Sequence, residues 1–227
     1  MVEGFKTQVG GDRLIFQNVL NGATVIHENH RGLGVVLLNS EGQIVKCFSS
    51  KSRLLTFVRN KVRCSKADKQ FRSSLMLSRL GLLTPEIFGI LRFASGEPYE
   101  SAIVCEYLGN IQPLSSFIQT ISSEKRTTVL CELASQIGIM AKNGVLFIDF
   151  HLGNVLIDSQ SKMWWIDPEL WFSARKVRQQ FWARMERMHR KCNLGLLTEA
   201  EWRFFCECLN HEVSMVCGSY PTREDHG

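Results

Sequence analysis

The sequence predicts an α+β fold in which a small antiparallel sheet comes first and a mainly helical part follows. β-prone runs dominate before about residue 106, and helical periodicity dominates after it. The 227 residues are enough for one domain, or for two small lobes packed as one unit. With 44% hydrophobic and 22% charged residues, the composition is that of an ordinary globular protein and not of a disordered chain.

The first half of the chain has the pattern of a β-hairpin. Short apolar runs occur at residues 23–27, 35–38 and 43–48. The last two flank Asn39-Ser40-Glu41-Gly42, a turn-forming composition. Because side chains alternate along a strand, Lys46 is expected on the opposite face from its neighbours Val45 and Cys47.

A helix is expected at residues 66–80, followed by a strand at 102–108. Apolar side chains recur at near-helical spacing in the first segment. Gly81 and then Pro85 follow the last periodic residue, which is a typical helix stop.

The second half alternates helices with short β runs. Helices are expected at about 112–121 and 124–143, short strands at 145–148, 155–157 and 163–166, and mainly helix from residue 173. The polar segment 149–154 therefore forms a loop between two β runs.

This loop has the residues that phosphoryl transfer needs. Asp149 and Asn154 have the Asp-x-x-x-x-Asn spacing of a kinase catalytic loop. Asp149 would accept the proton of the attacking hydroxyl, and Asn154 would offer its amide oxygen to a divalent ion. Asp167 lies thirteen residues beyond Asn154, after a strand, where it can bind a second metal ion or bridge both. His151 is expected to orient the loop by hydrogen bonding, although a metal-ligand role is the alternative.

These segments resemble small kinase-fold enzymes. Residues 149–158, Asp-Phe-His-Leu-Gly-Asn-Val-Leu-Ile-Asp, resemble Asp-x-His-x-Gly-Asn-x-Leu, and Trp165-Ile166-Asp167-Pro168-Glu169 resembles Ile-Asp-x-Glu. Both motifs occur in bacterial lipopolysaccharide kinases and in aminoglycoside and choline phosphotransferases. The compact length is most similar to the lipopolysaccharide core heptose kinases. The resemblance covers roughly residues 23–170 in the expected order.

The resemblance assigns roles in the first half as well. Lys46 matches the phosphate-binding lysine, with an ordinary exposed strand lysine as the alternative. Gly32 and Gly34 occupy the place of a glycine-containing phosphate loop, although such a pair is also common in simple turns. Glu106 and Leu108 belong to the segment 106–108 that matches the interlobe hinge, whose backbone would pair with adenine.

The implied organisation is an N-lobe over residues 1–108 and a C-lobe over residues 109–227. The C-lobe would contain the catalytic loop 147–154, the metal motif 167–169 with Glu169 in support, and basic C-terminal helices.

Three departures argue against a protein kinase regulated by loop phosphorylation. Phe147 replaces the usual His two residues before the catalytic Asp, and Ile148 replaces the Arg that binds a phosphorylated activation loop. The metal motif lacks the Gly of Asp-Phe-Gly, and no Ala-Pro-Glu follows it.

A fourth departure concerns the partner of Lys46. The helix that usually supplies a Glu to this lysine has Gln70 at the matching position, with Asp68 nearby. Gln can hydrogen-bond Lys46 but cannot neutralise it. Either Asp68 substitutes, or Lys46 is held loosely, or the enzyme is weak.

The C-terminal region adds cysteines and a basic helix. The spacing of Cys206, Cys208, His211 and Cys217 matches no common zinc site, so free thiols are expected. The helical segment 175–191 has an apolar face, which predicts packing on a core, and a basic face that is either solvated or in contact with an anionic membrane surface.

The expected function is an ATP- and Mg²⁺-dependent kinase that phosphorylates a sugar hydroxyl, with an inner-core heptose of lipopolysaccharide as the acceptor implied by the resemblance. The alternatives are another small acceptor, or a kinase-like nucleotide-binding or scaffold protein with little turnover. The net charge of +5 favours anionic partners such as nucleotides, phosphorylated sugars or an acidic bilayer, and nucleic acid is not expected. With neither a signal peptide nor a membrane span expected, the predicted location is the cytoplasm, with the cytoplasmic face of the inner membrane as a peripheral site.

Overall fold

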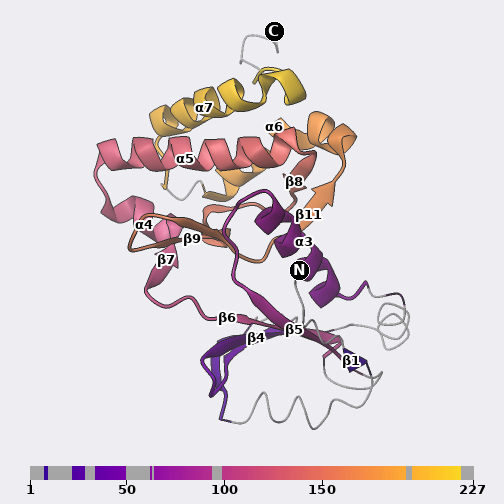
Figure 1. Cartoon of the computed structure of the whole chain (residues 1–227). Helices are drawn as coiled ribbons and strands as arrows, with labels where there is room; N and C mark the ends of the chain where they lie inside the picture. Colours follow the sequence, from indigo (N-terminus) through magenta and orange to yellow (C-terminus); the bar gives the residue numbers. More distant parts are fainter. Residues whose placement is uncertain are drawn as a thin grey trace. The chain divides into compact units, whose positions relative to one another are not determined.

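The computed structural model describes residues 8–9, 22–28, 34–49, 62, 64–93, 99–192 and 196–220 (Figure 1). The chain divides into two compact units. The first takes in residues 1–75 and 85–109, and the second takes in residues 76–84 and 110–227.

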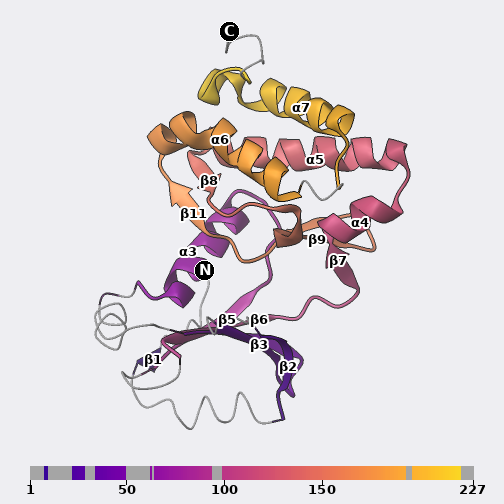
Figure 2. The same cartoon turned by 180° about the vertical axis from the view of Figure 1, so that it is seen from behind.

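The first unit is built on a six-stranded sheet with the order β1-β5-β6-β4-β3-β2 (Figure 2). Its strands are β1 (Gln8–Val9), β2 (Thr24–Glu28), β3 (Gly34–Leu38), β4 (Gln43–Phe48), β5 (Ile87–Arg92) and β6 (Ser101–Glu106). Every neighbouring pair is antiparallel except β1 with β5.

The predicted hairpin is confirmed as β3 and β4. Asn39 organises its turn, because the side-chain Oδ1 accepts hydrogen bonds from the N–H groups of Glu41 at 3.1 Å and Gln43 at 2.8 Å. The predicted alternation along β4 is also confirmed. Val45 and Cys47 are fully buried, whereas Lys46 between them is half-buried on the other face.

Helix α3 (Lys66–Arg79) packs on the face of the sheet to which Lys46 belongs. Ala67 is buried against Ile90 and Ile103, and Phe71 packs against the same cluster. The N-terminus of the helix is capped by Ser65 and Asp68, and its C-terminus is closed by the N–H of Leu82 donating to the carbonyl of Leu77 at 3.0 Å.

Strand β5 was not predicted. It contains Gly89, and its register with β6 shifts between Ile87 and Gly89. The irregularity interrupts the two-residue alternation that identifies a strand in a sequence.

Within the described residues, the second unit combines four α-helices with two small sheets. The helices are α4 (Leu114–Thr120), α5 (Ser123–Lys142), α6 (Ala174–Cys192) and α7 (Glu199–Cys217). One sheet has the order β10-β9-β7, and the other pairs β11 with β8. Its strands are β7 (Ile111–Pro113), β8 (Val145–Phe147), β9 (Val155–Asp158), β10 (Met163–Trp165) and β11 (Leu170–Phe172).

The core of the second unit lies among α5, α6 and α7 and the short strands. α6 contributes its predicted apolar face, and Val177, Phe181, Met185 and Met188 are all buried. α5 contributes Leu130, Leu133, Ala134 and Ile137, and α7 contributes Trp202, Phe205, Leu209 and Val213. Burial of these side chains holds the three helices together, with α5 and α6 in contact with β8 and with α7 packed mainly against α5 (Figure 1).

The predicted α+β class is therefore confirmed: in the residues that the structure describes, the first unit has a mainly antiparallel sheet with helix α3 and the second unit is mainly helical. None of the helices in the described ranges is long and apolar enough to cross a bilayer.

Candidate active site

The loop with Asp149 follows strand β8 directly and is anchored at its base. The N–H of Ile148 donates to the carbonyl of Glu169 at 2.8 Å, which extends the β8–β11 pairing by one step. This bond connects the predicted catalytic loop to the predicted metal motif. The side chain of Asp149 is exposed to solvent beyond this anchor.

Three buried aromatic rings pack beside the loop and restrain its backbone. Phe147, Phe150 and Trp165 are buried and form a mutual cluster with ring-centroid distances of 5.6–6.0 Å. Packed aromatic rings have few alternative rotamers, so the backbone on both sides of Asp149 is held in place. Phe147, which replaces a His in the family pattern, acts here as a core residue.

Asn154 is oriented by the same loop. Its Nδ2 donates to the backbone carbonyl of Asp149 at 3.0 Å, and its backbone N–H donates to the carbonyl of His151 at 2.9 Å. The amide nitrogen therefore faces the loop, and Oδ1 points away from the Asp149 carbonyl. An oxygen in this orientation is a suitable ligand for a hard divalent cation.

Asp167 lies two residues after the end of β10 and has an unusual backbone conformation. Its φ of 51° is in the left-handed region, which few non-glycine residues adopt, and its side chain is exposed. The preceding residue, Ile166, donates its N–H to the carbonyl of Asn154 at 2.9 Å. The structure thus brings the segments of the two predicted metal ligands together through a backbone hydrogen bond.

The supporting residues His151 and Glu169 contribute through their backbones. His151 is half-buried and precedes the short 3₁₀ turn Leu152–Asn154, in which its carbonyl accepts from Asn154. Glu169 has an exposed side chain, and its carbonyl accepts from Ile148.

Lys46 lies in the first unit, on the face of the sheet that α3 covers. Its register partners are Val36 on β3 and Ile103 on β6, and its Nζ is 5.4 Å from the ring centroid of Phe48. Gln70 is half-buried on α3, three residues after the Ala67 that packs against the same face, and residues three apart share a helix face. The two side chains therefore belong to the same layer of the first unit.

Asp68 is engaged elsewhere. Its Oδ2 accepts from the N–H of Ser65 at 3.1 Å, from the Ser65 hydroxyl at 2.6 Å and from Nε of Arg92 at 3.2 Å, and its Oδ1 is bound by Nη2 of Arg92. Burial alone would raise the pKa of this carboxyl. The hydrogen bonds from Arg92 and Ser65, together with the charge of Arg92, outweigh burial and lower it. Both oxygens of Asp68 thus serve the buried pair with Arg92 and the cap of α3.

Of the four residues predicted to contact the nucleotide, the structure describes Gly34, Glu106 and Leu108. Gly34 begins β3, where an added Cβ would lie 2.6 Å from the carbonyl oxygen of Cys47, so close backbone approach explains this glycine. Gly32 lies outside the described residues. The N–H of Glu106 donates to the carbonyl of Glu86 at 2.8 Å, so a contact from Glu106 to adenine has to use its carbonyl. Leu108 is half-buried just after β6.

One residue beside the loop was not predicted. Arg184 on α6 donates from Nη1 to the carbonyl of Ile148 at 3.1 Å, and its guanidinium carbon is 4.6 Å from the ring centroid of Trp171. No specific signal in the sequence points to it. Arg184 directly precedes the buried Met185, but Lys176 and Arg187 directly precede the buried Val177 and Met188 in the same way.

In the described ranges, no group of three or more His, Cys, Asp or Glu side chains is placed to hold a metal ion. The pair proposed for a cation here combines an amide with one carboxylate, a set of oxygen donors that suits Mg²⁺ better than a soft metal.

The order of sheet, helix and helical unit, with the Asp149–Asn154 loop tied to the Asp167 segment, defines a protein of the kinase-like class. The model of the lipopolysaccharide kinase (Kdo/WaaP) family matches residues 28–208, most of the chain. The chain belongs to this family.

Two further comparisons add less. No curated protein matches the chain. Many solved structures match, among them one described as vaccinia related kinase 3, with 16% sequence identity and a TM-score of 0.38. That match covers 62% of this chain and 45% of the other, so the chain spans less than half of that structure.

Proposed function

We propose that the chain is an ATP-dependent kinase that phosphorylates a hydroxyl of a lipopolysaccharide sugar, with an inner-core heptose as the acceptor. The observation that supports it most is the geometry of the loop, in which Asn154 hydrogen-bonds the carbonyl of Asp149 while Ile166, beside Asp167, hydrogen-bonds Asn154. Family membership agrees with the general activity. The heptose is taken from resemblance in length and motif.

In this proposal Asp149 is the catalytic base. Its exposed carboxylate accepts the proton of the acceptor hydroxyl as the oxygen attacks the γ-phosphorus of ATP. The hydrogen bond from Asn154 and the Phe147–Phe150–Trp165 cluster hold the backbone of Asp149 in one position. Such positioning accounts for much of the catalysis in phosphoryl transfer, because the protein takes little covalent part.

Asn154 and Asp167 would hold Mg²⁺, which supplies charge neutralisation across the phosphate oxygens. Both residues offer oxygen donors from segments joined by the Ile166–Asn154 hydrogen bond. Lys46 would bind the α- and β-phosphates, and Gln70 would hydrogen-bond Lys46 without neutralising it. Gly32 and Gly34 would line the phosphate loop, and Glu106 and Leu108 would contact adenine through their backbones.

The test is Mg²⁺-dependent ATP consumption by the purified chain with core lipopolysaccharide as acceptor. The informative variants are Asp149→Asn and Asp167→Asn, which keep side-chain size and remove the charge. Asp158→Asn is the matched control. It makes the same Asp-to-Asn change at a nearby residue with no proposed role in catalysis, whose Oδ1 accepts hydrogen bonds from the N–H groups of Gln160 and Lys162 in the β9–β10 turn. We expect activity in wild type and in Asp158→Asn and none in the two other variants. Equal turnover in wild type and Asp149→Asn would overturn the proposal.

Acceptor identity is tested by the site of phosphorylation. Mass spectrometry of the reacted lipopolysaccharide should place the new phosphate on a heptose. A phosphate on another sugar would support the proposed kinase activity but contradict the heptose as its acceptor. Turnover only with aminoglycosides or other small metabolites would reject lipopolysaccharide as the substrate. ATP binding without turnover on any acceptor would indicate a nucleotide-binding or scaffold role.

The basic face of α6 is proposed to contact an anionic bilayer that holds the acceptor. The exposed basic residues Arg175, Arg178, Arg187 and Arg190 lie away from the buried face of the helix. The neighbouring Phe172 is 50% exposed. Each Arg close to an anionic surface adds about 1 kcal/mol of binding free energy.

This contact is tested with lipid vesicles. We expect the chain to cosediment with phosphatidylglycerol vesicles at low salt, and we expect the double variant Arg175→Gln/Arg178→Gln to lose that binding. Equal binding to neutral phosphatidylcholine vesicles would contradict this contact.

A further inference from the structure

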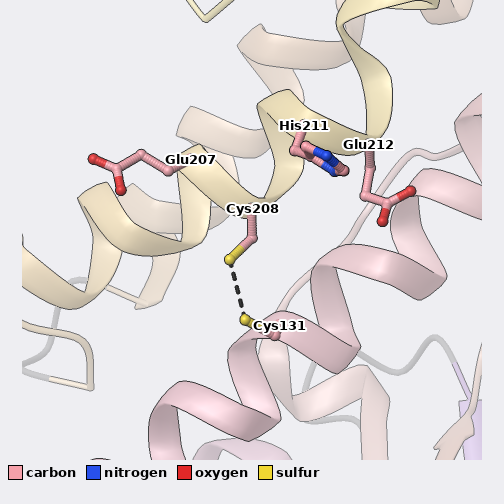
Figure 3. A pocket seen from close by; sticks show the side chains of 5 residues that line it. All are labelled: Cys131, Glu207, Cys208, His211 and Glu212. Atoms are coloured by element: carbon pink, nitrogen blue, oxygen red, sulfur yellow. Dashed lines mark hydrogen bonds between the residues drawn. The ribbon is translucent and has the colours of Figure 1, made fainter.

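Helices α5 and α7 bring two thiols together at the surface of the second unit. Cys131 on α5 and Cys208 on α7 have their sulfur atoms 3.2 Å apart, 77 residues apart in the chain (Figure 3). Figure 3 shows both side chains pointing towards each other across the gap between the helices. Neither residue belongs to the kinase loop.

The pair lies beside an open pocket of about 380 Å³. Its lining consists of Cys131, Glu207, Cys208, His211 and Glu212. Cys131 is exposed and Cys208 is half-buried, so a small reagent reaches Cys131 first. The site is therefore accessible to a redox reagent dissolved in water.

The helices that bear these thiols are held firmly against each other. An added Cβ on Gly138 of α5 would lie 2.7 Å from Cβ of Glu212, so the two backbones approach closely there. Lys142 on α5 also forms an ion pair with Glu212 on α7. On the other side of the two cysteines, Arg126 on α5 forms an ion pair with Glu201 on α7 at 3.1 Å. Because the helices are held on both sides of the thiols, the two sulfurs remain near each other for long enough to react.

We propose that Cys131 and Cys208 form a reversible intramolecular disulfide, with a low-molecular-weight disulfide such as oxidised glutathione as the oxidant. A disulfide requires a sulfur–sulfur distance of about 2.05 Å, so the sulfurs have to approach by little more than about 1 Å. Side-chain rotation provides a movement of this size.

The reaction proceeds in two exchange steps. The Cys131 thiolate attacks one sulfur of the oxidant, forms a mixed disulfide and releases one small thiol. The thiol of Cys208 then loses its proton to solvent and attacks the Cys131 sulfur, which expels the second small thiol. The protein loses two electrons and two protons, and the oxidant gains them.

The environment of Cys208 supports this order. Burial, followed by the neighbouring Cys131, raises the pKa of Cys208 to about 12, so Cys208 keeps its proton at neutral pH. A protonated Cys208 leaves the first attack to Cys131, and Cys208 attacks in the second step only after it has lost its proton, because the thiolate is the nucleophile.

The test starts from the reduced full-length chain, treated with oxidised glutathione after removal of the reductant. We expect two thiols to be lost per chain, with no covalent dimer. Digestion with trypsin and a Glu-specific protease should yield residues 127–132 linked to residues 208–212, because cleavage after Glu207 separates Cys206 from Cys208. We expect the melting temperature to rise by about 5 °C or more, and a dithiol reductant should reverse the rise.

Cys131→Ser and Cys208→Ser should each remove the shift in melting temperature, whereas Cys64→Ser, which replaces another partly exposed thiol, should retain it. Stable glutathione on Cys131 without the cross-link would overturn the proposal. So would a cross-link to another cysteine, or no oxidation where a reference dithiol is oxidised. The peptide result needs only wild type, so it decides even if a serine variant does not fold. None of these outcomes depends on kinase activity.

Discussion

Arg184 on α6 donates a hydrogen bond to the backbone carbonyl of Ile148, the residue directly before the proposed base Asp149, at 3.1 Å. The same guanidinium stacks on Trp171 at 4.6 Å. Position 148 is Ile in this chain, where protein kinases regulated by loop phosphorylation have an Arg. The structure brings a different Arg to the backbone of that position from a helix 36 residues later in the chain.

Arg184→Met should lower kcat about tenfold and leave KM for ATP nearly unchanged. A hydrogen bond from a charged donor contributes about 1.5–3 kcal/mol, and here it restrains the backbone of the base without touching the nucleotide. Arg184→Lys should recover little, because an ammonium cannot both stack on Trp171 and reach the carbonyl in the manner of a guanidinium. Steady-state kinetics and melting temperature should be measured together.

Arg187→Met is the matched control, since Arg187 is an exposed Arg on the same helix. It should keep full kcat. A fall in melting temperature without a fall in kcat for Arg184→Met would assign Arg184 a purely structural role.

The local parts of the fold could be predicted from the sequence, whereas contacts between distant residues could not. The β3–β4 hairpin, α3 and the loop 149–154 are defined by turn residues, capping signals and short-range alternation. Strand β5 was missed because Gly89 and its register shift interrupt the alternation. The missed strand also concealed the pairing of Arg92 with Asp68, because a strand that is not predicted cannot place its Arg beside a helix cap.

The same limit applies to the site. Asp149, Asn154 and Asp167 are recognisable because their spacing reflects one continuous loop and hairpin. Arg184 depends on how α6 packs against β8 and β11, and no spacing rule connects it to Ile148.

Substitutions of Asp167 should affect activity and stability differently. Its φ of 51° disfavours side chains other than Asn, Asp and Gly, so Asp167→Asn should keep wild-type stability while activity is lost. Asp167→Val should lose activity too and should also cost about 1–2 kcal/mol in free energy of unfolding. Urea denaturation with a parallel ATPase assay checks both. Equal stability of the Asn and Val variants would contradict the backbone argument.

The buried Asp68–Arg92 pair should dominate the acid sensitivity of the first unit. Asp68→Asn should cost about 3–5 kcal/mol at pH 7, because it leaves the charge of the buried Arg92 without its carboxylate. The folded-state pKa of Asp68 is lowered, so its contribution to stability is present above the unfolded value of about 3.9 and is lost as pH falls through the folded pKa.

The stability difference between wild type and Asp68→Asn should therefore shrink as pH falls below about 4. Urea denaturation across a pH series measures it. Glu201→Gln serves as a control. It removes the charge from a half-buried capping-box residue on α7 that also pairs with Arg126 at 3.1 Å, and it should cost only about 1 kcal/mol. A difference that stays constant down to pH 2 would show that folding does not lower the pKa of Asp68.

Gln70→Glu tests the proposed layer of Lys46 and α3. Lys46 lies on the sheet face that Ala67 and Phe71 of α3 cover, and Gln70 is half-buried three residues after Ala67, on the same side of the helix. A carboxylate at position 70 would form a partly buried ion pair with Lys46 and hold its ammonium in one position. A pair of this kind contributes about 1 kcal/mol, so kcat/KM for ATP should rise about fivefold.

Ser78→Glu is the control: it adds the same charge to an exposed position of α3 and should leave kcat/KM for ATP unchanged. The gain should also disappear in Lys46→Met/Gln70→Glu, because the new carboxylate then has no cation to pair with. If Gln70→Glu and Ser78→Glu both fold and Gln70→Glu leaves kcat/KM for ATP unchanged, phosphate binding by Lys46 does not depend on the residue at position 70.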